Sequence, residues 1–227
     1  MLFSNPEVQE FLEKNFVLTW NEVRPVPKVE IDFGDGKKLT RTLMGNTVIY
    51  VCRPDGTVVD ALPGIYTPHD FLKEIKVSLA ALAVSDENLA DHHKGLVEAD
   101  VTKERARVSM SKARVESPLL AALGVPQYES PDGESKPMAL DVSKIPKSRA
   151  EMEAMGSAEQ VVAKDSSNNV RYVRPIVHFI LSRQNAAQKP EQLRETIFAQ
   201  ALGFDIKDPY LGLASLLLPG TPGGRTN

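Results

Sequence analysis

The sequence is poor in cysteine, since its 227 residues include only Cys52. A single cysteine excludes an intrachain disulfide, a Cys-x-x-Cys redox pair and any zinc or iron–sulfur site built on several cysteines. Cys52 ends an apolar run, where a free cysteine behaves as a small hydrophobic side chain, so a packing role is favoured. The alternative is a lone redox-active thiol, which needs exposure and a lowered pKa.

Histidines are also few, and their spacing is not that of metal ligands. His92 and His93 are adjacent and point to different faces of a helix, whereas a helical metal pair needs a spacing of four. His178 lies in an apolar run and is expected to pack, and His69, near a helix start, is expected to face solvent. We predict no metal site and no bound cofactor.

A strong charge of either sign is missing. Lysine and arginine number 27 against 30 aspartates and glutamates, a net charge of −3, which leaves no electrostatic footprint for nucleic acid. The basic run 103–114 has no aromatic residues between its charges and is typical of a solvated helix face. No nucleic-acid partner is expected.

Long apolar runs are absent too. The longest, such as 79–84 and 213–218, fall far short of the roughly 20 residues that span a bilayer. The first ten residues, MLFSNPEVQE, lack the apolar region of a signal peptide. We expect no membrane span and, by default, a cytoplasmic protein.

Known catalytic motifs are not found. The glycine-rich pieces 34–36 and 220–224 do not lie between a strand and a helix, as nucleotide-binding loops do. Ser109-x-x-Lys112 matches a motif of penicillin-binding enzymes, but the companion motifs are absent. No complete catalytic constellation emerges, so the sequence leaves open whether the protein is an enzyme.

What the sequence does contain is a regular order of elements in its first 80 residues. Asn5 and Pro6 begin a helix to about residue 14, and FVLTW at 16–20 is typical of a buried strand. Residues 23–43 alternate and turn at 34–36, which predicts an inserted hairpin. A second hairpin is predicted from 47–52 and 57–62, joined by Arg-Pro-Asp-Gly. A helix capped by Thr67 closes the series.

Beyond residue 80 helix formers dominate. A helix is predicted from about residue 85 to 113, and a proline-rich loop over about 124–147. A capping box starts a helix at 148 that ends near 164, with KDSSNN at 164–169 as a break. Helices follow around 173–181, from Pro190 to about 201 and after residue 208, and 219–227 is a frayed tail.

The ββα unit 47–75, with Gly64 after its last strand, resembles the end of a thioredoxin-like domain. The helix and strand before it resemble relatives that join the first helix directly to the second strand. NFVLTW at 15–20 and CRPDGTVV at 52–59 are similar to the redox region of selenoprotein N-like proteins. The resemblance implies an α/β (α+β) fold: an incomplete thioredoxin-like domain over 1–80, then a mainly helical extension over 81–218.

Departures from that family affect its functional elements. The Cys-x-x-Cys or selenocysteine pair and the first strand would lie before Met1, so they are missing from this chain. The turn that corresponds to the cis-proline loop is Gly45-Asn46-Thr47, without proline. These three residues are the candidate binding positions, and Cys52 is the redox candidate.

Two functions of different class follow. The first is a non-catalytic binding or scaffold protein of thioredoxin-like type, with protein partners that the sequence does not identify. The second is a thiol or selenol oxidoreductase whose catalytic N-terminal segment is missing from this chain. The second predicts low stability or self-association, because a lost strand would expose part of the sheet.

Overall fold

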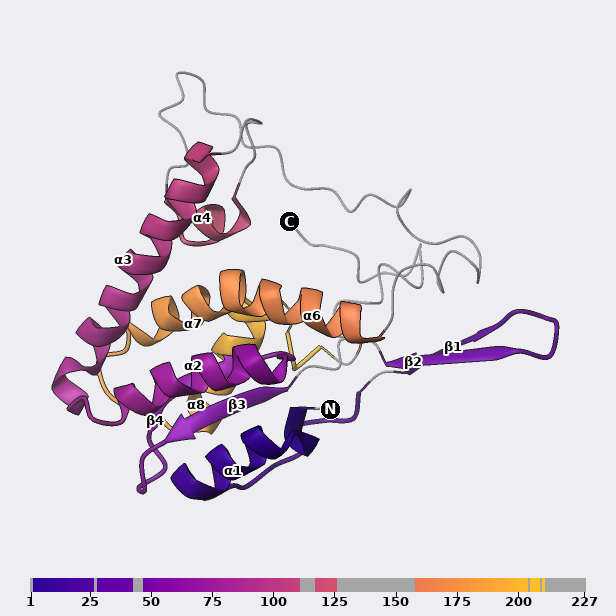
Figure 1. Cartoon of the computed structure of the whole chain (residues 1–227), viewed down its shortest axis with the longest axis horizontal. Helices are drawn as coiled ribbons and strands as arrows, with labels where there is room; N and C mark the ends of the chain where they lie inside the picture. Colours follow the sequence, from indigo (N-terminus) through magenta and orange to yellow (C-terminus); the bar gives the residue numbers. More distant parts are fainter. Residues whose placement is uncertain are drawn as a thin grey trace.

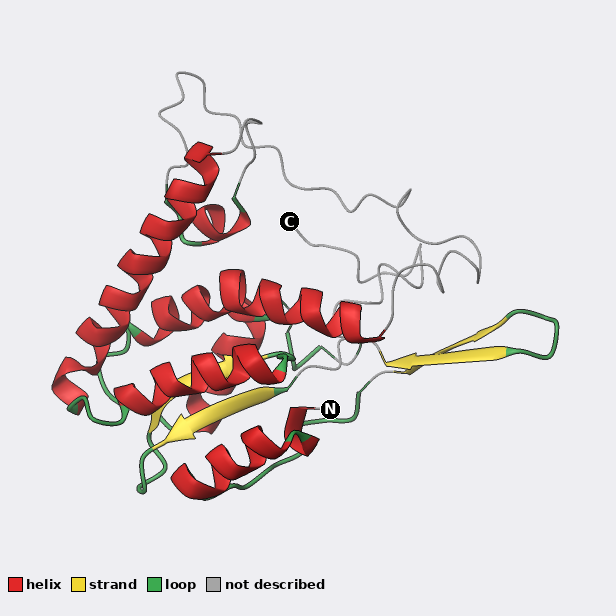
Figure 2. Cartoon of the chain, in the orientation of Figure 1, coloured by secondary structure: helices red, strands yellow, loops and turns green. Residues whose placement is uncertain are grey.

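Helices gather around a short antiparallel sheet, and a second sheet projects to one side (Figures 1 and 2). This computed structural model describes residues 2–26, 28–42, 47–110, 117–125, 158–203, 205–208 and 210. Within them the chain is mostly helical, with strands in its first third. The expected α+β class is confirmed.

Helix α1 (Pro6–Asn15) begins as predicted, after a short 3-10 turn, η1 (Leu2–Ser4). The Asn5 side-chain oxygen accepts a hydrogen bond from the Val8 backbone N–H at 3.2 Å. An asparagine cap satisfies a donor that the helix itself leaves unpaired, and a proline in the first turn removes no helical hydrogen bond. Val8 and Leu12 are buried, so one face of α1 packs on the core.

The predicted strand over 16–20 is wrong. Residues 17–23 have no regular secondary structure, and Val17 and Trp20 are 100% and 85% exposed. Within the described part of the chain, no backbone hydrogen bond engages 17–23. A β-rich sequence forms a strand only when a neighbouring strand takes up its backbone groups, and here the segment has no such neighbour.

The inserted hairpin is confirmed. Strands β1 (Lys28–Asp32) and β2 (Lys38–Thr42) pair in antiparallel register, Lys28 opposite Thr42 and Asp32 opposite Lys38. Gly34 and Gly36 have φ of 75° and 81° in the turn, a conformation that glycine adopts without strain. The hairpin extends away from the helices (Figure 1), and it is a sheet of its own.

The second predicted hairpin forms the central sheet. Strands β3 (Val48–Cys52) and β4 (Val58–Pro63) pair antiparallel, and every position of β4 is buried. The register shifts between Val51, opposite Asp60, and Cys52, opposite Val58. Val59 is therefore an extra residue in β4, a β-bulge, which locally twists a strand and re-aims its groups.

Helices cover both faces of this central sheet. On one face lies α1 with α2 (Pro68–Ala81), which is capped by Thr67 as predicted, and on the other lie α7 (Arg174–Leu181) and α8 (Pro190–Thr196). The first cluster of buried apolar residues includes Leu12, Val51, Leu62, Phe71 and Ile75. The second includes Val58, Ala61, Val177, Ile180, Leu193 and Ile197. The C-terminal helices thus complete the core of the sheet.

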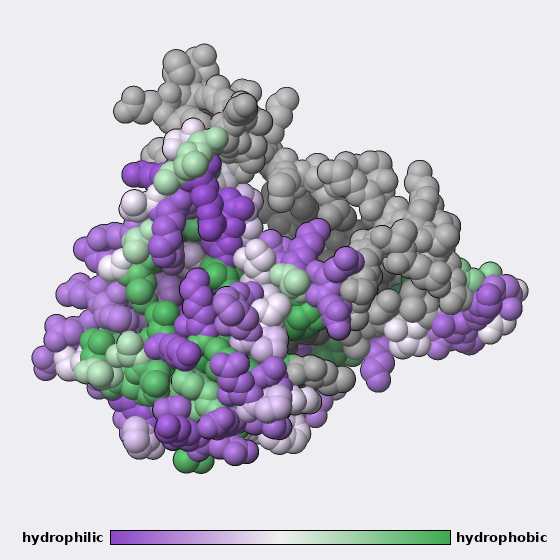
Figure 3. Space-filling view, in the orientation of Figure 1, coloured by the Kyte–Doolittle hydropathy of each residue, from purple (hydrophilic) through white to green (hydrophobic). Residues whose placement is uncertain are grey.

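Helix α3 (Asp86–Met110) follows α2 and runs along the edge of the molecule, with the short helix α4 (Pro118–Ala122) beside its far end (Figure 1). Its surface is largely hydrophilic (Figure 3). Only Leu89, His93 and Glu104 of its 25 residues are buried. This long helix therefore buries few side chains completely, although it packs along α7.

The predicted break over 164–169 is wrong. Helix α6 (Ala158–Asn168) continues through a π-helical turn, η3 (Asn169–Val173), directly into α7. Serine and asparagine favour turns, but here the Ser166 hydroxyl accepts from the Thr67 N–H, and the Asn169 side chain donates to the Ile65 carbonyl. Tertiary partners for these polar side chains keep the helix continuous.

A second π-helical turn, η4 (Ile197–Ala201), extends α8, and Gly203, with φ of 77°, follows it, close to the predicted end. The predicted proline-rich loop, the start of the helix at 148, the helix after 208 and the tail lie mostly or wholly outside the described residues. Among the helices described, none is long and apolar enough to cross a membrane.

Candidate functional site

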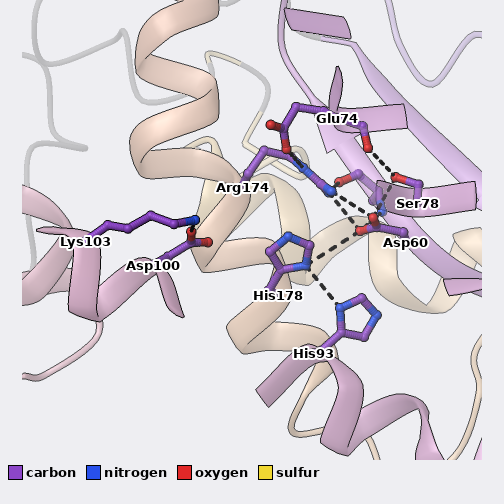
Figure 4. A network of polar contacts seen from close by, with 9 residues as sticks. Asp60, Glu74, Ser78, His93, Asp100, Lys103, Arg174 and His178 are labelled. Carbon is purple, nitrogen blue, oxygen red and sulfur yellow. Dashed lines mark hydrogen bonds and ion pairs between the residues drawn. The ribbon is translucent and has the colours of Figure 1, made fainter. Parts of the chain in front are cut away.

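A buried polar network lies where β4, α2, α3 and α7 meet (Figure 4). Its centre is Asp60, which is 0% exposed in the middle of β4. Arg174 and His178 of α7 and Ser78 of α2 contact Asp60. Glu74 of α2 joins through Arg174, and His93 of α3 joins through His178. Three consecutive elements, β4, α2 and α3, and the distant helix α7 thus contribute to one cluster.

The Asp60 carboxylate is saturated with hydrogen-bond donors. One oxygen accepts from the Ala61 N–H and from Arg174 Nη1, both at 2.8 Å. The other accepts from Arg174 Nη2 at 2.8 Å and from the Ser78 hydroxyl at 2.6 Å. The forked pair of bonds from arginine is the strongest geometry for a carboxylate.

Arg174 is itself only 1% exposed. Its Nε donates to Glu74 at 3.2 Å, and its Nη1 also donates to the Ala61 carbonyl. Burial by itself would raise the pKa of Asp60, but the Arg174 charge and its hydrogen bonds hold that pKa well below the usual range. Burial by itself would lower the pKa of Arg174, but the charge and hydrogen bonds of Asp60 outweigh burial and raise that pKa. Both groups are therefore charged, and each keeps the other so.

His93 and His178 form a stacked pair next to this ion pair. Their Nδ1 atoms are 3.0 Å apart and their ring centroids 5.2 Å. His93 Nε2 lies 2.8 Å from the carbonyl oxygen of Val59, the bulge residue. Because a carbonyl only accepts, we assign the proton of neutral His93 to Nε2. Its Nδ1 then accepts from His178 Nδ1–H.

Both imidazoles are neutral at pH 7. Burial lowers the pKa of His93, with the Asp60 charge only partly offsetting it. Burial and then the Arg174 charge hold the pKa of His178 well below its ordinary value of 6.5. The pair therefore joins α3 to α7 through an uncharged N–H···N hydrogen bond.

The same three residues, Asp60, His93 and His178, bring ligand-type atoms within 4.8 Å of one another. Their other contacts disfavour a metal ion. Both lone pairs of the Asp60 oxygen nearest His178 are taken by Ala61 and Arg174, and a cation there would also face the Arg174 charge in a buried site. The geometry is that of a closed hydrogen-bonded network.

A second polar cluster fixes the far end of α3. Glu104 is 1% exposed and accepts two hydrogen bonds from Arg171 of η3, at 3.0 and 2.7 Å. The Ser117 hydroxyl, which caps α4, donates to it at 2.8 Å, and Arg107 lies 3.5 Å away. Burial opposes ionisation, but the Arg171 and Ser117 hydrogen bonds lower the pKa of Glu104.

The structure places only two of the residues predicted from the sequence, Thr47 and Cys52, so the candidate binding turn stays a prediction. Gly45 and Asn46 lie outside the described residues, and the Thr47 carbonyl accepts a backbone hydrogen bond from Gly64. Cys52 is partly buried, and burial followed by the charges of Glu191 and Asp55 raises the pKa of its thiol. A raised pKa leaves little nucleophilic thiolate.

The network itself was missed from the sequence, although two signals exist. Asp60 is a charged residue inside the apolar run TVVDAL, and Arg174 is a charged residue in the face that contains Val173 and Val177. A buried charge requires a partner of opposite charge. Pairing the two would have predicted that α7 packs on β4.

A different kind of candidate is the segment 16–26 together with the β1–β2 hairpin, which we call the contact arm. Val17, Leu18 and Trp20 are exposed apolar side chains on unpaired backbone. The Arg24 side chain ties the segment to the carbonyls of Ile206 and Asp208, at 2.9 and 2.7 Å. The arm thus presents apolar side chains from a tethered base.

Comparison with known protein families, curated proteins and solved structures finds no match for this chain.

Proposed function

We propose that this protein is a non-catalytic protein-binding module of thioredoxin-like type that uses the contact arm to bind an extended strand of a partner polypeptide. The observation that carries the proposal is the exposure of Val17, Leu18 and Trp20 on backbone that has no hydrogen-bond partner within the described residues. Large apolar side chains gathered on one exposed segment are typical of interaction sites.

The kind of partner follows from the backbone. A run of free N–H and C=O groups is a template for β-augmentation, in which a partner adds its own strand. The apolar side chains of FVLTW would then contact apolar residues of that strand. The exposed apolar part of the arm, 16–23, contains no basic side chain that would bind a nucleic-acid backbone.

The polar sites support a binding role over catalysis. Among the described residues, the polar network centred on Asp60 is buried, and its carboxylate is already hydrogen-bonded to Arg174. Its groups are therefore not accessible to a substrate. The Cys52 thiol has a raised pKa. Neither group meets the requirement of an exposed nucleophile with an adjacent base.

The thioredoxin-like part of the proposal rests on element order. α1, the antiparallel β3–β4 hairpin and α2 occur in the order of the resemblance, and α1 and α2 pack on the same face of the hairpin. The absence of a strand at 16–20 is a departure from that pattern.

The test is site-specific photo-crosslinking in extracts of the source cells, with benzoylphenylalanine at Leu18. We expect a discrete product whose cross-linked peptide is an extended, apolar segment of another protein. Thr19→Pro, which removes one backbone N–H, should abolish the product, whereas Thr19→Val, which keeps it, should not. The same probe at Met110, an exposed apolar residue on α3, is the control.

Equal products from positions 18 and 110 would contradict the proposal, as would insensitivity to Thr19→Pro. A cross-linked product of two copies of this chain would show that the segment mediates self-association and does not bind a different protein.

A second candidate function uses the same observation. The unpaired segment directly after α1 is where a thioredoxin-like sheet would continue, so an upstream strand of a longer form could occupy it. Such a form would be a thiol or selenol oxidoreductase. The intact mass of the endogenous protein decides: a larger mass with an upstream Cys-x-x-Cys or selenocysteine segment supports this candidate, and the mass of the 227 residues contradicts it.

A further inference from the structure

Few side chains of α3 are fully buried, although it packs along α7 and has half-buried apolar side chains such as Leu96 and Val97. Of its three buried residues, only Leu89 is apolar; the other two, His93 and Glu104, can bind protons. At its start, Arg53 donates to the carbonyls of Leu82 and Val84 and pairs with Asp86 at 2.9 Å. The start of α3 is thus held by Arg53, whereas farther along the helix the buried polar contacts come from His93 and Glu104, which are titratable.

The His93 attachment requires the neutral imidazole pair. With His178 Nδ1–H donating to His93 Nδ1 across 3.0 Å, a second proton on His93 would set two N–H groups against each other. A proton on His178 would place a buried positive charge close to Arg174. While α3 is packed on α7, the two histidines therefore bind protons weakly. Once α3 separates and the imidazoles are in water, they bind protons readily.

Charged and titratable groups face the pair from every neighbouring element. β4 contributes Asp60, α2 contributes Glu74, α7 contributes Arg174, and His92 lies beside His93 on α3 itself. Asp60 favours a proton on the pair, but it is already paired with Arg174, and Glu74 is paired with the same arginine. Burial and the Arg174 charge prevail, as the lowered pKa of each histidine indicates.

Glu104 acts at lower pH in the same direction. Its docked form is the carboxylate, bound by Arg171 and Ser117 and close to Arg107. Protonation removes the charge that Arg171 and Arg107 contact. Once α3 is released, the carboxyl recovers its ordinary pKa and takes up the proton more easily.

We propose that α3 is a proton-released helix: on acidification it detaches from α7 and β4 as a local unit, pivoting near residues 82–86, while the β3–β4 sheet with α1 and α2 stays folded. Local opening of weakly attached elements below the threshold for global unfolding is a general property of proteins. Here protons select the element that opens, because they bind the open form preferentially. The proposal is independent of the contact arm.

The experiment is hydrogen–deuterium exchange with mass spectrometry on the full chain between about pH 7.5 and about pH 5, the range in which histidine titrates. Labelling times are lengthened at low pH to offset the slower intrinsic exchange. Protection of α3 peptides should fall by up to about tenfold per pH unit for each histidine that takes up a proton. Protection of β4 and α2 peptides, which exchange only on global unfolding, should remain higher than that of α3 peptides at each pH.

Two variants separate the cause from general acid sensitivity. His93→Gln cannot be charged, so the pH dependence of α3 protection should shrink. His69→Gln removes an exposed histidine, with a side chain 88% exposed, and should behave as the unchanged protein. If His93→Gln fails to fold, the comparison of α3 and β4 protection in the unchanged protein still tests the proposal.

The proposal is overturned if α3 and β4 are equally protected at every pH, so that they open together, or if α3 protection is constant over this range. It is also overturned if the purified protein holds a stoichiometric transition metal that sharpens α3 protection, because a metal would occupy the histidine lone pairs.

Discussion

At the scale of single residues, one buried ion pair dominates. Asp60 and Arg174 are each almost completely buried, and the pair is compensated by Ser78, Glu74 and two backbone groups. Taking charges out of water is costly, and mutual attraction restores that cost only with good geometry. The pair therefore determines that α7, which carries Arg174, packs on β4, and its net contribution to stability is small.

Removing one partner of this pair should be severely destabilising. Arg174→Met leaves Asp60 as an uncompensated buried charge, and we expect a loss of about 3 to 5 kcal/mol in the free energy of unfolding. Urea denaturation at neutral pH measures it.

The double variant Arg174→Met with Asp60→Leu is the matched control. It buries no charge, so it should be more stable than Arg174→Met alone. A double variant as unstable as the sum of the two single variants would show that the pair has no coupling energy.

Gly64 is a second critical residue. Its φ is 88°, and a Cβ at this position would lie 2.4 Å from the Asn169 side-chain nitrogen. Gly64→Ala combines backbone strain with a clash against the hydrogen bond that Asn169 donates to Ile65. We expect a loss of about 2 to 3 kcal/mol, where strain alone accounts for roughly 1.

Gly36→Ala isolates the strain, because Gly36 has a similar φ of 81° with nothing within 4 Å. Thermal denaturation of both variants compares them. Equal losses would mean that the contact with Asn169 contributes nothing.

At the scale of elements, the sequence predicted features that depend on residues close together in the chain, such as helix starts. It did not predict features that depend on contacts between distant segments. The starts of α1 and α2 follow from Asn5 and Thr67 with the prolines after them, since caps act within a few residues. The segment 16–20 has the composition of a strand, but composition cannot supply a neighbour. The helix through Ser166 and Asn169 depends on contacts with residues about a hundred positions away.

The candidate site was equally hidden, for the same reason. His93 and His178 are 85 positions apart and are joined only once α3 and α7 pack together. Spacing rules for metal or catalytic residues compare neighbours on one element, so they consider His92 with His93 and cannot detect the contact between His93 and His178 across two helices.

The β1–β2 hairpin projects from the body, and this makes a prediction about stability. Replacing 28–42 by a short glycine–serine link should leave the midpoint of thermal unfolding within a few degrees, because no buried residue is described in the hairpin. Circular dichroism on heating measures it. A large drop in the midpoint would mean that the hairpin belongs to the folded core.

For the whole molecule, the two buried histidines set the direction of pH dependence. Their pKa values are lowered in the folded state, so below the ordinary value of 6.5 the unfolded chain binds more protons. Their contribution to stability is complete above that value and is lost as the pH falls toward the folded-state values. We expect the free energy of unfolding to fall by up to about 1.4 kcal/mol per pH unit for each histidine.

Urea titrations at several pH values between 7.5 and 5.5, chosen as roughly the range in which histidine titrates, measure this loss. His69→Gln should leave it intact. A free energy of unfolding that stays level across the range would contradict neutral, buried histidines. The carboxylates with lowered pKa values, Asp60, Asp70 and Glu104, add a further loss only at lower pH.

The separation between Asp60 and Arg174 along the chain, 114 positions, bears on how the protein is made. On a ribosome, β4 emerges on the order of ten seconds before α7 at usual rates of synthesis. During that interval one face of the central sheet lacks its covering helices and Asp60 lacks its counter-charge. The nascent N-terminal part therefore exposes apolar side chains of the sheet, such as Val58 and Ala61, until α7 and α8 are synthesised.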